Sequence, residues 1–126
     1  MDLRTPLGRV RGRGSAKDGT SHWWRQRLTA MALVPLVIWF VTSMAGLAGA
    51  DYATTVAWLS SPLVAIVMLA LLLAGFYHMK LGLQAVIEDY VHDAAAKITA
   101  QILVLFATVG LGLACVFAVL KLAVGV

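Results

Sequence analysis

The residues of this chain with the clearest potential for chemistry lie between positions 75 and 92. There a long apolar run contains one histidine, His78, and ends in the acidic, tyrosine-bearing segment Glu88-Asp89-Tyr90. A helix turns about 100° per residue, so one helical face would carry, in order, Gly75, His78, Gly82, Ala85 and Asp89. Because glycine and alanine leave space beside a helix, a flat, bulky group could approach this face. Asp89 would lie roughly 16 Å beyond His78, about half the thickness of a bilayer core.

A histidine within hydrocarbon costs free energy unless it pairs, so His78 is a candidate functional residue. Three roles are open: an axial ligand of haem iron, a proton relay, or a hydrogen bond to a neighbouring helix. A six-coordinate haem needs a second axial ligand. His22 and His92 would both lie at membrane interfaces, so the second ligand would have to come from another chain.

Asp89 and Tyr90 could simply end a helix. A phenol beside a carboxylate at the water boundary could also donate a hydrogen bond to a quinone carbonyl and help to deliver protons. Lys80 lies nearly opposite His78 on the helix. It could extend to the interface or pair with an acidic group of a partner.

The elements that would position these residues are membrane spans. Of the 126 residues, 61% are hydrophobic and only 13% are charged, whereas about a quarter of a soluble domain is charged. Apolar runs predict spans at about 28–50, 62–87 and 97–120, with Pro35 expected to kink the first. Short loops make neighbouring spans antiparallel. We therefore expect an all-α membrane protein with three transmembrane helices in an up-down-up arrangement.

The charge of the chain is concentrated at its N-terminus. The net charge of +4 could suggest nucleic acid, but seven of the ten Lys and Arg residues precede position 28. Beside a span this pattern is an orientation signal; contact with anionic lipid or an acidic partner is the alternative. We expect residues 1–20 to be a basic cytoplasmic arm without regular structure, and residues 21–126 to be the anchor domain, with the C-terminus periplasmic. The lone Cys115 is expected to be a packing residue.

The spacing His78-x3-Gly82-x6-Asp89-Tyr90-Val91, preceded by Gln26-Arg27-Leu28-Thr29-Ala30, resembles a known family. It is similar to the D-type cytochrome b membrane-anchor subunit of succinate dehydrogenase, respiratory complex II, over roughly residues 21–120. The sister C-type anchor has an Arg-His pair in its histidine segment. Here Leu83-Gln84 follows Gly82, so the D-type is the better match.

This resemblance implies a fold and two shared sites. The three helices would pack with a C-type anchor subunit into a larger helical bundle in the membrane lipid. His78 would be one axial ligand of a haem b shared with a histidine of that subunit, and Arg27 would lie near the haem propionates. Tyr90 would hydrogen-bond the ubiquinone headgroup, with Asp89 supplying protons or positioning Tyr90. No nucleic acid is implied.

The resemblance also divides the enzyme between chains. Succinate oxidation would use FAD in a flavoprotein subunit and iron-sulfur clusters in a second partner, so this chain would be an enzyme subunit without a succinate site. Two alternatives stay open: a fumarate reductase anchor, and a non-catalytic assembly or transport subunit that uses His78 as an interhelical hydrogen bond. Because no clear transit peptide is present, we expect a bacterial inner membrane.

Overall fold

The computed structural model describes residues 5–10 and 19–125, and this part of the chain contains helices and no strands. The helices are α1 (Pro6–Val10), α2 (Gly19–Gly46), α3 (Tyr52–Leu59), α4 (Pro62–Tyr90) and α5 (Ala94–Val124). Three of them, α2, α4 and α5, are long and apolar enough to cross a membrane, with mean hydropathies of 2.0, 2.1 and 2.7. The predicted all-α architecture with three spans is confirmed.

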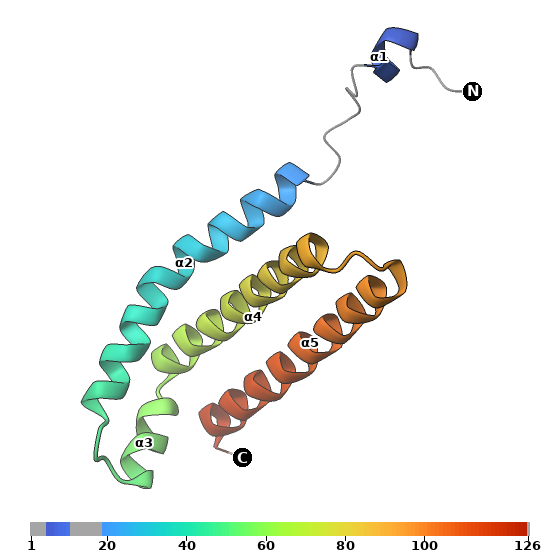
Figure 1. Cartoon of the computed structure of the whole chain (residues 1–126). Coiled ribbons are helices and arrows are strands. Elements are labelled where there is room, and N and C mark those ends of the chain that lie inside the picture. The colour runs from blue at the N-terminus through green and yellow to red at the C-terminus, as the bar shows by residue number, and fades with distance from the viewer. Residues whose placement is uncertain (1–4, 11–18, 126) are drawn as a thin grey trace.

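Helix α4 is the central helix. It packs against α2 on one side and α5 on the other, and among the described residues no Cα atom of α2 lies within 8 Å of one of α5. Figure 1 shows the three long helices in up-down-up order, with the α4–α5 turn at the opposite end from α3. On α5, Gly112 allows the Phe76 ring of α4 to approach closely, since a Cβ there would lie 3.4 Å from the ring.

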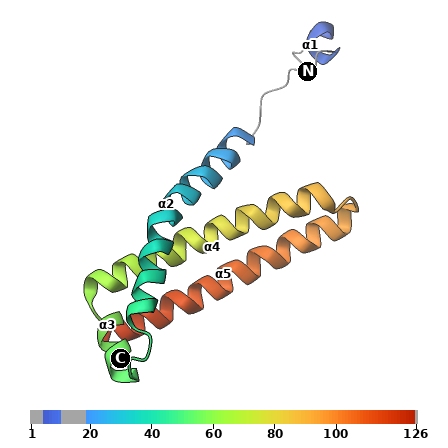
Figure 2. The same cartoon turned by 60° about the vertical axis from the view of Figure 1, so that its left-hand side comes forward.

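The helix boundaries differ from the predicted spans. Helix α2 ends at Gly46 and not near residue 50, α4 continues through the polar segment to Tyr90, and α5 runs from Ala94 to Val124. Helix α2 begins at Gly19, so the aromatic and cationic residues 21–27 are helical. It continues through Pro35 and changes direction near its middle (Figure 2). Helix α1 corrects the expectation of an arm without regular structure. The rest of that arm, residues 1–4 and 11–18, lies outside the described residues.

The segment between the first two spans is also more ordered than the expected loop, because it contains α3. The Asp51 side chain caps α3 by accepting a hydrogen bond from the Thr54 amide at 2.8 Å. Hydrogen bonds from the Thr54 side chain and from the Thr54 amide lower the pKa of the Asp51 carboxyl below its ordinary 3.8. Asp93 caps α5 in the same way, accepting from the Ala96 amide at 2.8 Å, and Pro62 stands at the start of α4, where no amide hydrogen is needed.

The packed core is small and lies at the α3 end of the bundle. Its buried members are Ala65, Met68 and Val119. The Trp39 and Trp58 rings stack beside them, with centroids 5.9 Å apart. Most large apolar side chains of the long helices are exposed. Exposing so much apolar surface to water is unfavourable, so this surface is suited to contact lipid or another membrane subunit.

Candidate functional site

His78 lies in the middle part of α4, is partly buried, and faces α2. Its Nδ1 atom lies 3.0 Å from the Thr29 hydroxyl oxygen. Its Nε2 atom lies 3.5 Å from the Gln26 side-chain nitrogen. The face of small residues predicted for α4 is thus occupied by α2. Gly82 lies on this face, where a Cβ would be in ordinary contact with the Gln26 side-chain nitrogen at 3.6 Å.

The surroundings of Nε2 are compatible with an additional ligand. The Gln26 contact is long, and the Gln26 Oε1 atom is buried without a hydrogen-bond partner among the described residues. Moving this side chain would therefore break only one weak contact. In the described part of the chain no three His, Cys, Asp or Glu side chains are grouped as for a metal ion. A haem iron needs only one axial nitrogen from this chain, so the residues present fit that group.

Asp89 and Tyr90 lie at the end of α4, where the side chains are open to the surroundings. Tyr90 is 78% exposed, and Asp89 is also exposed. Asp89 lies on the same side of α4 as His78, roughly 16 Å along the axis, whereas Tyr90 points about 100° around the helix from Asp89. The two side chains share one end of the helix but do not share one direction.

Glu88, directly before them, ties α4 to α5. Its carboxylate accepts hydrogen bonds from Gln84 at 3.0 Å and Gln101 at 3.4 Å. Its backbone carbonyl accepts from the Lys97 ammonium at 3.2 Å. Glu88 therefore has a structural role in this chain, and Asp89 and Tyr90 are the groups at this end left available to other molecules.

Arg27 does not lie beside His78 in this chain, although the resemblance places it near haem propionates. It is exposed and lies roughly 160° around α2 from Thr29, so it is on the outer side of that helix. Its guanidinium carbon lies 5.4 Å from the centre of the Trp23 ring. Arg25 is the arginine that turns toward α4, where it donates to the Tyr77 hydroxyl at 3.4 Å.

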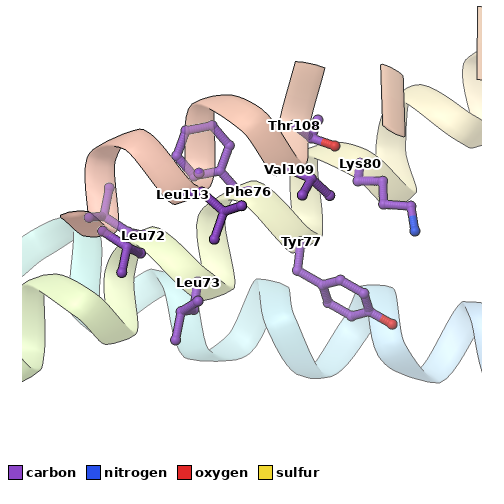
Figure 3. A pocket seen from close by; sticks show the side chains of 10 residues that line it. Leu72, Leu73, Phe76, Tyr77, Lys80, Thr108, Val109 and Leu113 are labelled. Carbon is purple, nitrogen blue, oxygen red and sulfur yellow. The ribbon is translucent and has the colours of Figure 1, made fainter. Parts of the chain in front are cut away.

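A groove of about 260 Å³ runs between α4 and α5 and is lined mostly by apolar side chains. Figure 3 shows Tyr77 and Lys80 at one end of it and Leu72 and Leu73 at the other. Lys80 also lines a more polar groove of about 370 Å³ between α2 and α4, together with His22. The His22 Nε2 atom is buried there and has no partner in the described part of the chain.

Sequence reasoning recognised the segment around Arg27 but not which of its residues face His78. Gln26 and Thr29 do so, because they are three residues apart and therefore share a face of α2. That spacing could have identified them, had α2 been expected to extend to residue 19. His92, expected at an interface, is exposed and lies with Nδ1 3.1 Å from the Tyr90 carbonyl oxygen.

The fold and these side chains define a small multi-pass membrane protein that carries His78 in the middle part of its central helix and exposed Asp89 and Tyr90 at one end of that helix. The chain belongs to the family described as succinate dehydrogenase/fumarate reductase transmembrane subunit, which matches residues 1–119. This confirms the predicted family.

Relatives named as succinate dehydrogenase hydrophobic membrane anchor subunits include proteins of Rickettsia bellii and Paracoccus denitrificans. The first is 34% identical over 90 residues, covering 71% of this chain and 72% of the relative. The second is 27% identical over 125 residues, covering 99% and 96%. A succinate dehydrogenase membrane anchor subunit of Reclinomonas americana is 28% identical over 93 residues, covering 70% and 76%. No solved structure matches. The predicted membrane-anchor function is confirmed by these findings.

Proposed function

We propose that this chain anchors a succinate dehydrogenase and supplies one axial ligand of a haem b and one wall of a ubiquinone site. The observation that supports the haem assignment is the position of His78 in the middle part of α4, with Nδ1 3.0 Å from the Thr29 hydroxyl and Nε2 facing a side chain with an unsatisfied oxygen. The observation that supports the quinone site is the exposure of Asp89 and Tyr90 at the end of the same helix.

In the proposed haem site His78 Nε2 would hold the iron from this chain, and a histidine of a C-type anchor subunit would hold it from the other. The bound haem would supply a one-electron acceptor between the two anchor chains. Thr29 holds the imidazole, and Gln26 moves away from Nε2. Arg27, which lies on the outer side of α2, would pair with a haem propionate.

In the proposed quinone site the Tyr90 hydroxyl donates a hydrogen bond to a quinone carbonyl oxygen. Reduction of ubiquinone to ubiquinol takes up two electrons and two protons. The electrons come from the iron-sulfur partner, and the protons come from water through the Asp89 carboxylate, which can accept and release one at the membrane boundary. Alternatively Asp89 positions Tyr90.

Succinate oxidation takes place elsewhere in this proposal. One cysteine, Cys115, cannot supply the thiolate ligands of an iron-sulfur cluster. The clusters belong to an iron-sulfur subunit and FAD to a flavoprotein subunit. The anchor contributes the membrane dock on which those subunits lie.

We further propose a bacterial inner membrane, with the N-terminus cytoplasmic and the C-terminus periplasmic. The basic residues before position 28 support this orientation. It places the Tyr90 end of α4 on the cytoplasmic side. A reporter fused after Val126 should be active only in the periplasm, and a cytoplasmic signal would reverse the topology.

The experiment that tests the function is purification in mild detergent through a tag on this chain, followed by a reduced-minus-oxidised spectrum and a succinate:ubiquinone assay. A co-purifying flavoprotein, a b-type haem band and quinone-dependent succinate oxidation are expected. Faster fumarate reduction by quinol would favour the fumarate reductase alternative. A folded chain without haem or partners would favour a non-catalytic subunit with a structural histidine.

A further inference from the structure

The Thr29 hydroxyl lies between a histidine and two backbone carbonyl groups. Its oxygen is 3.0 Å from His78 Nδ1. The same oxygen is 2.8 Å from the carbonyl oxygen of Arg25 and 3.0 Å from that of Gln26. A hydroxyl group has one hydrogen to donate and lone pairs with which to accept. Because carbonyl oxygens only accept, a hydrogen donated to one of them leaves the Thr29 oxygen to accept from Nδ1–H.

The side chain beside His78 Nε2 also favours a proton on Nδ1. The Gln26 atom nearest Nε2 is the amide nitrogen, which is a donor. A donor there, although at a long distance, is matched by a lone pair on Nε2, and a neutral imidazole with its lone pair on Nε2 carries its hydrogen on Nδ1. Both side chains from α2 thus favour the tautomer that a metal ion would need.

We infer that Thr29 is a positioning residue for the axial ligand of the haem. It fixes the tautomer and ring orientation of His78 by accepting a hydrogen bond from Nδ1–H. Its own hydroxyl donates a hydrogen bond to a backbone carbonyl of α2. This inference rests on the proposed haem function. A hydrogen bond from the far nitrogen makes an imidazole a stronger donor to the metal, and loss of such a partner typically lowers metal affinity by about 10- to 100-fold.

The chain contains a matched control. Thr42 lies on the same helix and makes the same two backbone bonds, at 2.9 Å to Ile38 and 2.9 Å to Trp39, but it is exposed and has no histidine beside it. Thr42→Val therefore measures the effect of removing a backbone-bonded hydroxyl from α2 where no histidine is affected. Thr29→Ser keeps a hydroxyl at the site, and Thr29→Val replaces it with a methyl group of similar size.

The experiment is a redox titration of the haem in the purified complete complex, with haem content per flavin measured on the same samples. We expect Thr29→Val to raise the midpoint potential or to lower the haem content, because a weaker imidazole donor stabilises ferric iron less. Thr29→Ser should stay close to wild type, and Thr42→Val should match wild type in both measurements.

Two results would overturn the inference: a Thr29→Val complex with the potential and haem content of Thr42→Val, or a Thr29→Ser complex as altered as Thr29→Val. Failure of the underlying proposal is distinguishable. A wild-type complex without haem, or a His78→Leu complex with an unchanged haem spectrum, would remove His78 as ligand regardless of Thr29.

Discussion

Replacing Tyr90 by phenylalanine removes one hydroxyl and keeps the ring. Tyr90 is 78% exposed, and no hydrogen bond joins its hydroxyl to another described residue, so the helix packing should be unaffected. A neutral hydrogen bond contributes about 0.5–1.5 kcal/mol net. Since 1.36 kcal/mol corresponds to a factor of ten in rate, we expect kcat/KM for ubiquinone to fall about 2- to 13-fold.

The assay compares two activities of one purified complex. Succinate:ubiquinone reduction should decrease, while dye-linked succinate oxidation should be unchanged because the flavin is in another subunit. Tyr52→Phe is the matched control. Tyr52 is 80% exposed and stands at the start of α3, at the opposite end of the membrane-spanning region. That variant should retain both activities.

The size of the effect separates two roles for Tyr90. Proton transfer from a positioned side chain typically contributes about 10²–10⁴-fold. A decrease of about 100-fold or more would therefore refute a role limited to hydrogen bonding. Unchanged ubiquinone kinetics would remove Tyr90 from the site, and a parallel loss of dye-linked activity would indicate defective assembly.

Three other predictions concern the haem site and α3. His78→Leu should alter the haem spectrum of an assembled complex without necessarily abolishing quinone reduction, and an unaltered spectrum would exclude His78 as ligand. Arg27→Gln should change the haem midpoint potential more than Arg25→Gln does in a redox titration; the reverse order would transfer the propionate role to Arg25. Because its folded-state pKa is lowered, the Asp51 carboxylate should stabilise α3 above pH 3.8 and lose this effect as the pH falls through the folded pKa. Hydrogen exchange at the Thr54 amide should then accelerate below that pH relative to an Asp51→Asn variant, and an equal response in both would contradict the assignment.

The number and order of the spans could be predicted because they depend on composition. An uncharged apolar run long enough to cross a bilayer predicts a helix wherever that helix packs. The predicted start of the second span, residue 62, coincides with Pro62, the first residue of α4. Helix ends were less predictable, since polar residues such as those from 21 to 27 can continue a helix once its apolar part has formed.

The surroundings of His78 could not be predicted, because they depend on the rotation of α2 about its axis. The apolar residues of α2 are spread around the helix and do not mark one face, so its sequence does not say which face meets α4. The resemblance drew attention to Arg27, whereas the packing brings Gln26 and Thr29 to the histidine. Only tertiary contacts distinguish these positions.

One polar side chain of α2, Gln26, lacks a donor for its oxygen, and one of α4, Lys80, lacks an acceptor for its ammonium among the described residues. The Gln26 side chain beside His78 has a buried, unsatisfied oxygen, and Lys80 has no hydrogen-bond or ion-pair partner among the described residues. Hydrocarbon cannot satisfy either group. His78 and Lys80 lie roughly 160° apart around α4, yet α2 borders both, since Thr29 contacts His78 and His22 lines one groove together with Lys80. The Lys80 ammonium therefore needs an acceptor from outside the described residues, such as an acidic group of a partner segment or a lipid headgroup.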